Sequence, residues 1–130
     1  MPVREELVVP GGAPTVSHYT DAVRFGDLLH VSGMVALSPD GEVVGRGDVT
    51  AQARYVHELL GKTFALVGAS FADVLKVTVY LTDIDDRQAV NEIRKEFFGA
   101  AKPASTLVQV SALVLPELLV EIEAVVGIPS

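Results

Sequence analysis

The stretch KPASTLVQVSALVLPELLVEIEAVV, Lys102 to Val126, reads as two strands joined by a loop around Pro116. Side chains alternate between the two faces of a strand. One face of the second strand is therefore entirely apolar, while the other carries two carboxylates, Glu121 and Glu123. Carboxylates in such a strand must face water, a pocket or a second subunit. The stretch predicts a sheet with one face in the core and a second face that meets water, a pocket or another subunit.

The sequence before this stretch predicts the other strands of the sheet. Alternation, turn residues and β-branched side chains place them at residues 3–9, 22–25, 28–35 and 74–81, with a short extension at 42–44. The strand at 74–81 is the clearest, and four of its apolar residues are expected to share one face: Leu75, Val77, Val79 and Leu81.

Two helices are expected between these strands. Asp48 is a candidate N-cap for a helix that runs to about Val67, with Gly68 after it. Acidic residues at 83–86 mark the start of a second helix, which ends at Gly99. The order of elements predicts one α/β (α+β) domain over residues 1–130, in which one mixed six-stranded sheet has both helices on one face. The outward apolar residues Leu107, Leu119 and Val125 favour covering of the other face by a second copy.

Composition narrows the classes of function. The chain has 130 residues, 49% of them hydrophobic, and a net charge of −7 without any basic cluster. DNA or RNA is therefore not expected as a bulk electrostatic partner. There is no cysteine, which removes thiolate chemistry and disulfides. No signal peptide is expected, and no apolar run reaches the roughly 18 residues of a membrane helix, so a cytoplasmic location without membrane contact is the expectation.

Several short motifs follow one another along nearly the whole chain. They are Pro14 with Tyr19, Ala22 and Val23, then Val31-Ser32-Gly33, Val77 to Asp83, Val90-Asn91, Phe97-Phe98-Gly99, Lys102-Pro103-Ala104 and Val120 to Ala124. In this order and spacing they resemble the Rid family of reactive intermediate deaminases, also called YjgF-like or L-PSP endoribonuclease-like proteins. The resemblance implies a chorismate-mutase-like fold, a homotrimer, and small-molecule pockets between its subunits.

The same resemblance implies hydrolysis of a reactive enamine or imine, such as 2-aminoacrylate, without a metal or organic cofactor. Glu121 matches the pocket glutamate of the family and would hold the attacking water as a general base. The alternative for Glu121 is a solvated or salt-bridged strand carboxylate, and Glu123 is expected to be structural. A metabolite-binding trimer without catalysis is a second function to consider, and endoribonuclease-like activity is a weaker third.

One position departs from the family pattern. The motif arginine that pairs with a substrate carboxylate is replaced here by Ser105. A hydroxyl cannot replace a permanent charge in a bidentate pair. Carboxylated imines are therefore in doubt as substrates, and a neutral C–N compound is the other possibility. Arg24 and Lys102 are the candidates to supply the missing charge, although no spacing supports either, and Leu107 is expected to alter the shape of the pocket.

The remaining candidates each have a structural alternative. Tyr19, the second expected catalytic residue, would hydrogen-bond a ligand or only pack its loop against the sheet. Ser32 and Gly33 would bring backbone groups close to a ligand, or Gly33 would serve strand curvature. Asn91, Ser105 and Thr106 are expected to contact the ligand, or to be ordinary helix and strand residues. His18 could add a proton donor beside Tyr19, but no histidine has a partner at metal-ligand spacing, so no metal site is expected.

Overall fold

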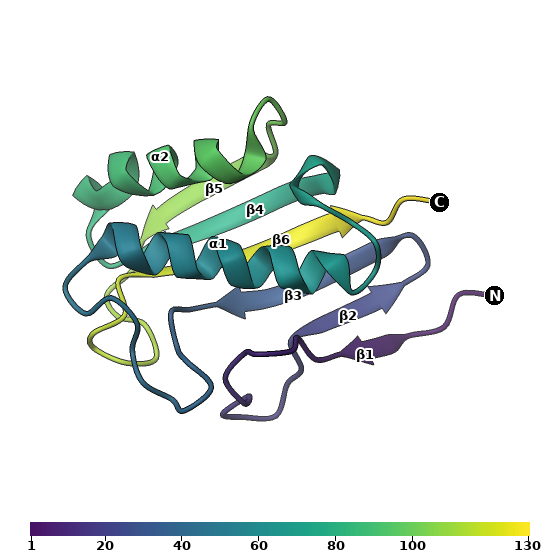
Figure 1. Cartoon of the computed structure of the whole chain (residues 1–130), viewed down its shortest axis with the longest axis horizontal. Coiled ribbons are helices and arrows are strands. Elements are labelled where there is room, and N and C mark those ends of the chain that lie inside the picture. The colour runs from purple at the N-terminus through teal and green to yellow at the C-terminus, as the bar shows by residue number, and fades with distance from the viewer.

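A mixed six-stranded sheet covered on one face by two helices forms the structure (Figure 1). The computed structural model describes all 130 residues. In chain order the elements are β1 (Glu5–Leu7), β2 (Ala22–Phe25), β3 (Leu28–Met34), α1 (Val49–Ala65), β4 (Val74–Leu81), α2 (Arg87–Phe98), β5 (Ala104–Gln109) and β6 (Val120–Gly127), with single 3-10 turns at η1 (Phe71–Asp73) and η2 (Ile84–Asp86). The predicted α+β class, the mixed sheet and the placement of both helices on one face are confirmed.

The last strand of the chain lies inside the sheet. The strand order is β1-β2-β3-β6-β4-β5, so β6 separates β3 from β4. It pairs antiparallel with both neighbours, whereas β4 and β5 are parallel and are connected through α2. In Figure 1, α1 crosses in front of β6 and β3, and α2 lies next to β5 at the edge of the sheet. Residues of β6 therefore contact the core on one face and line the open face on the other.

Asp48 caps the first helix as expected, whereas the acidic residues at 83–86 precede the second helix and do not start it. The Asp48 carboxylate accepts a hydrogen bond from the Ala51 backbone N–H at 3.1 Å, and α1 begins at the next residue. Gly68 has φ of 71° just after the helix, a conformation that favours glycine. Asp83 caps the short turn η2, so that α2 itself begins only at Arg87. Neither helix has the length and apolarity that crossing a membrane would require.

Alternation along β6 is confirmed. Val120, Ile122, Ala124 and Val126 are buried beneath the helices, and the intervening Glu121 and Glu123 lie on the open face. The open face is the side of the sheet away from the helices, where Glu121 lies opposite Tyr80 and Glu123 lies opposite Thr78.

Local irregularities contradict three of the expectations. Leu75 does not share the core face of β4, because a bulge there leaves Val74 buried and Leu75 52% exposed. Residues 42–44 form no strand, and only an isolated bridge joins Val43 to Leu37. Leu107 does not face outward, since it pairs with buried Val79 and packs against the core.

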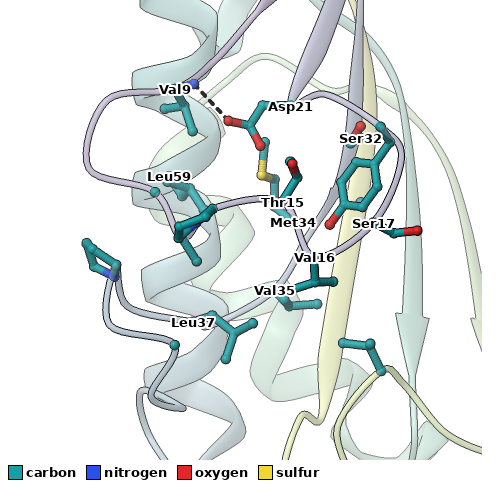
Figure 2. A pocket seen from close by; sticks show the side chains of 18 of the residues that line it. Val9, Thr15, Val16, Ser17, Asp21, Ser32, Met34, Val35, Leu37 and Leu59 are labelled. Carbon is teal, nitrogen blue, oxygen red and sulfur yellow. Dashed lines mark hydrogen bonds between the residues drawn. The ribbon is translucent and has the colours of Figure 1, made fainter.

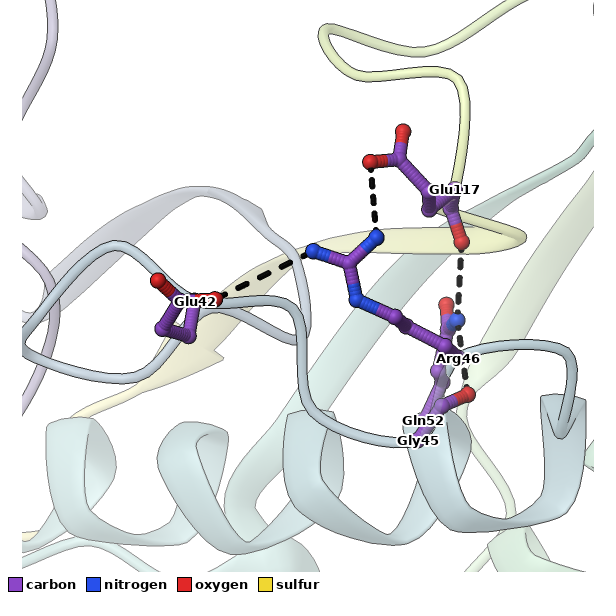
Figure 3. A network of polar contacts seen from close by, with 5 residues as sticks. All are labelled: Glu42, Gly45, Arg46, Gln52 and Glu117. Atoms are coloured by element: carbon purple, nitrogen blue, oxygen red, sulfur yellow. Dashed lines mark hydrogen bonds and ion pairs between the residues drawn. The ribbon is translucent and has the colours of Figure 1, made fainter.

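A buried glutamine ties α1 to the loop that precedes β6 (Figure 3). The Gln52 side-chain amide donates hydrogen bonds to the Gly45 and Glu117 carbonyl oxygens at 3.1 and 3.0 Å. Its own oxygen accepts from the Leu119 backbone N–H at 2.8 Å. On the surface, Arg46 contacts the Glu117 carboxylate at 3.0 Å. Gln52 thereby fixes the end of the Val110–Leu119 loop, which contributes to the site described next.

Candidate functional site

A cavity of about 920 Å³ lies beside the end of β3, between β6 and the segment that joins β1 to β2 (Figure 2). Four of the residues singled out from the sequence meet there, namely Tyr19, Ser32, Gly33 and Glu121. Apolar side chains form much of the remaining wall, among them Val9, Val16, Met34, Val35, Leu37, Leu59, Val114 and Leu115.

The segment between β1 and β2 is held in place at its base by a buried aspartate. Asp21 is only 7% exposed, and its carboxylate accepts a hydrogen bond from the Val9 backbone N–H at 2.9 Å. Its carbonyl accepts from the Ser32 N–H at 2.9 Å. The Ser32 hydroxyl donates to the Thr20 carbonyl at 2.6 Å. These bonds join the two ends of the segment to each other and to β3, so that residues between them bend over the cavity.

Ser32 has a structural partner in this arrangement. Its hydroxyl proton and its backbone N–H are both used to hold the segment between β1 and β2. A ligand could still donate a hydrogen bond to the Ser32 oxygen, because a hydroxyl has two acceptor lone pairs.

Gly33 makes room for the carboxylate of Glu121. A bulge in β3 sets three steps, from Val31 to Met34, against two steps of β6, and Gly33 lies within it. A Cβ built on Gly33 would overlap the Oε2 atom of Glu121 and come within 2.7 Å of its Cδ. The close approach of the backbone explains this glycine, since a side chain could not share the space.

The two carboxylates of β6 differ in their surroundings. Glu123 accepts a hydrogen bond from the Tyr80 hydroxyl at 3.1 Å. The Glu121 carboxylate, in contrast, forms no hydrogen bond or ion pair with any other group of the chain, although the Glu121 backbone is paired in the sheet. Partial burial, together with the negative charge of Glu123, raises the Glu121 pKa above the usual glutamate value. Glu121 is thus the carboxylate free to bind a water or a ligand group.

The other predicted site residues lie away from this cavity. Ser105 and Thr106 are exposed on β5, and Thr106 accepts a hydrogen bond from the Lys76 ammonium at 2.6 Å. Leu107 packs in the core, and Asn91 is exposed on α2. β4 and β6 separate β5 from β3 within one chain. A ligand contact by any of these four residues stays a prediction, and within one chain it would need a second site.

The charged candidates are also outside the cavity wall. Arg24 lies on β2, and Lys102 is exposed before β5. His57 is a buried residue of α1 and packs against the rings of Phe71 and Phe97. No group of three or more carboxylate or imidazole side chains comes together as a set of metal ligands.

Sequence reasoning missed Asp21 and the apolar walls of the cavity. Asp21 directly precedes the strand β2. An acidic residue at the boundary between a polar loop and an apolar strand is a signal that could have indicated a buried hydrogen bond. Val16, Leu37, Val114 and Leu115 are in loops, where no periodic pattern identifies a buried or ligand-facing side.

Comparison with known proteins gives a consistent assignment. The family described as Endoribonuclease L-PSP matches residues 11–128. A RutC family protein of Pyrococcus horikoshii is 38% identical over 123 residues, which cover 93% of this chain and 96% of that protein. The 3-aminoacrylate deaminase RutC of Acinetobacter baylyi is 34% identical over 122 residues, with the same coverage of 93% and 96%. A structure of a Rid family protein of unknown function from Yersinia pestis has a TM-score of 0.89 at 28% identity, covering 96% of this chain and 99% of that one.

Proposed function

The chain belongs to the Endoribonuclease L-PSP family, the YjgF-like or Rid proteins, and on that premise we propose that it hydrolyses a small enamine or imine. The observation that carries the proposal is Glu121, whose carboxylate borders the cavity, has a raised pKa and hydrogen-bonds no other residue. The name of the relative from Acinetobacter baylyi, a 3-aminoacrylate deaminase, supports this class of reaction.

In the proposed reaction, Glu121 accepts a proton from a water molecule while the water oxygen attacks the imine carbon. The C=N bond becomes a single bond, and the nitrogen takes up a proton from solvent. The protonated Glu121 then gives its proton to the amino group, which leaves as ammonia. The hydroxyl proton returns to Glu121 as the carbonyl forms. Glu121 then releases this proton to solvent, which replaces the proton that the nitrogen took up. Water and imine are thereby converted to carbonyl compound and ammonia, with Glu121 ionised again.

Tyr19 and Ser32 would orient the substrate. Tyr19 lines the cavity and is 50% exposed, so its hydroxyl is able to hydrogen-bond a ligand. The Ser32 oxygen is able to accept a hydrogen bond from the substrate nitrogen. We propose these two roles as positioning and Glu121 as the general base.

The proposed active unit is a homotrimer. The open face carries Glu121 and Glu123 next to the partly exposed Leu119 and Val125, a mixture that a second copy would cover. In an assembly of this kind, β5 of a neighbouring copy would bring Ser105 and Thr106 to the cavity of the first. Light scattering at micromolar concentration tests the assembly, because a monomer mass would exclude it.

The direct test of the function is a hydrolysis assay. Purified protein is mixed with freshly generated 2-aminoacrylate, with other iminoacids and with imines that lack a carboxylate, and both imine loss and ammonia release are followed. We expect acceleration over buffer for at least one imine and little for 2-aminoacrylate. A rate equal to buffer for every imine would exclude the hydrolase.

Ser105→Arg tests why 2-aminoacrylate is a poor substrate. The substitution restores a guanidinium that pairs with a carboxylate. We expect a gain on 2-aminoacrylate and none on an imine without a carboxylate. Absence of any gain would mean that the deficit on carboxylated imines has another cause.

A binding protein without catalysis is the second candidate. The apolar wall of the cavity and the absence of the motif arginine favour it. A ligand that raises the melting temperature and is recovered chemically unchanged would support this function over the hydrolase.

A further inference from the structure

The cavity is acidic as well as apolar. Three carboxylate residues line it, namely Asp21, Asp40 and Glu121, and no lysine, arginine or histidine does. The cations of the chain are engaged elsewhere or lie outside the wall. Arg46 contacts Glu42 and Glu117, and Arg54 contacts Glu96. A cleft lined by one sign of charge with low-dielectric walls concentrates ligands of the opposite sign.

The three carboxylates are not equivalent. Asp21 uses one oxygen to accept from the Val9 N–H, and Asp40 is exposed in a turn at the rim. Glu121 is partly buried and has no partner, so an ionised Glu121 carries a charge that no group of its own chain balances. Such a charge is stabilised by a cationic ligand and strongly disfavours an anionic one nearby.

The size of the cavity indicates the size of the ligand. At about 920 Å³ it is at the upper end of the roughly 300–1,000 Å³ typical of small-molecule sites. A three-carbon compound would leave most of the apolar wall of this chain uncovered. Val16, Leu37, Val114 and Leu115 instead suit a ligand with a sizeable apolar group.

We propose that the cavity selects a cation with an apolar substituent, a protonated amine or iminium, and excludes the matched carboxylate. The inference rests on the cavity of the proposed function and names its substrate class. A protonated imine is also the more electrophilic form, so the ion recognised by Glu121 is the one that water attacks. In that form the iminium and one water give a carbonyl compound and an ammonium ion, and total charge is conserved.

Binding of three matched probes tests the selection. Benzylammonium, benzyl alcohol and benzoate share one ring and differ in charge. Titration calorimetry on the purified full chain at neutral pH and low salt gives the three Kd values. We expect benzylammonium to bind at least about tenfold more tightly than benzoate, with the alcohol between them, and the difference to shrink as salt is added.

Two variants separate the site from the general acidity of the protein. Glu121→Gln removes the free charge and is expected to abolish most of the preference for benzylammonium while benzyl alcohol binds as before. Glu58→Gln makes the same chemical change at an exposed position of α1 and is expected to leave the preference intact. Binding of benzoate as tight as that of benzylammonium, or no binding of benzylammonium at millimolar concentration, would overturn the proposal.

The binding measurements and the hydrolysis assay test the two proposals separately. If benzylammonium binds selectively but no imine is hydrolysed, the cation site stands and the hydrolase does not. If carboxylated imines are hydrolysed well and benzoate competes with them, the hydrolase stands and cation selection is wrong.

Discussion

The carboxylate of Glu121 occupies the space that a side chain on Gly33 would need. The two residues come from neighbouring strands, β6 and β3, and the bulge in β3 brings the glycine backbone against the glutamate. The position of the Glu121 carboxylate therefore depends on residue 33 being glycine. A substitution at Gly33 moves this carboxylate but leaves it a carboxylate.

Gly33→Ala is predicted to displace the Glu121 carboxylate while the fold persists. The new Cβ would overlap the flexible end of a side chain, which is able to rotate away. The free energy of unfolding should change by less than about 1 kcal/mol, because alanine also gains in strand preference. Imine hydrolysis should fall by about tenfold or more, because a base misplaced by 1 Å loses much of its effect. Rate assays and denaturant unfolding measure the two quantities.

Gly127→Ala is the matched control. It adds the same methyl group to β6, where the nearest atoms of Asp73 and Leu75 would be 3.7 Å away, an ordinary contact. Its activity should equal that of the wild type. Equal loss in both variants would trace the effect to the sheet and not to Glu121.

Glu121→Gln is predicted to lower kcat by about 10²–10⁴-fold, the usual effect of losing a general base. The base acts when ionised, so the wild-type rate should rise with pH through a pKa above the ordinary glutamate value. Burial and Glu123 also make the folded pKa higher than the unfolded one. The folded state thus binds the proton more tightly, and the contribution to stability is present below the unfolded pKa and lost as pH rises through the folded pKa. The variant should therefore be no less stable than wild type at pH 7, which thermal unfolding checks.

Glu123→Gln provides the comparison. The amide oxygen still accepts from the Tyr80 hydroxyl, but the charge that helps raise the Glu121 pKa is gone. Hydrolysis should persist, and the pH at which the rate falls on the acidic side of the pH–rate profile should be lower than in the wild type. If the decrease in rate at acidic pH disappears in Glu123→Gln and persists in Glu121→Gln, Glu123 and not Glu121 is the base.

His57 is predicted to make stability fall in mild acid. Its Nδ1–H donates to the Ala53 carbonyl at 2.7 Å, and burial is the main cause of a lowered pKa. The unfolded chain therefore takes up the proton first, and stability falls as pH drops below about 6.5 towards the folded pKa, by at most about 1.4 kcal/mol per pH unit. His57→Phe should remove this contribution, as measured by denaturant unfolding at pH 7.5 and 5.5.

His30→Gln is the control for this pH dependence, because His30 is exposed on β3. The difference in stability between pH 7.5 and 5.5 should remain as in the wild type. If the free energy of unfolding of His57→Phe changes between pH 7.5 and 5.5 as much as that of the wild type, other groups are responsible.

Gln52→Met is predicted to destabilise the fold by about 2–4 kcal/mol. The methionine fills a similar volume but leaves the Gly45 carbonyl, the Glu117 carbonyl and the Leu119 N–H without their partner. Chemical denaturation measures the loss. The same substitution at Gln88, exposed on α2, should have an effect below about 0.5 kcal/mol. A small effect at Gln52 would mean that water replaces the lost bonds.

Periodic elements were predictable from the sequence, and the exceptions have physical causes. The apolar face of β6 and the cap at Asp48 depend on local patterns that the fold retains. Leu75 was assigned to the wrong face because a bulge adds one residue to β4, and a bulge leaves no mark in an alternating pattern. Leu107 was assigned outward because its partner strand, the parallel β4, was not known.

The candidate site was predictable only in part. Motif resemblance identified Tyr19, Ser32 and Glu121, which all line one cavity. It also named Ser105, which lies on β5 and does not line that cavity within one chain. The role of Asp21 depends on a hydrogen bond to Val9, twelve residues away. Contacts of this kind are set by the three-dimensional path of a loop and have no periodic signal.

The position of β6 has a consequence for synthesis on the ribosome. The strand that joins the two halves of the sheet is made last, so β1-β2-β3 and β4-β5 have no shared partner until Val120–Gly127 has emerged. Pairing between strands so distant in the sequence is slow to form. A nascent chain that stops before Val120 would expose the edges of β3 and β4 and lack Glu121. Synthesis of β6 therefore completes the sheet and adds the proposed base in the same step. A chain that stops earlier lacks that base and exposes strand edges to chaperones and proteases.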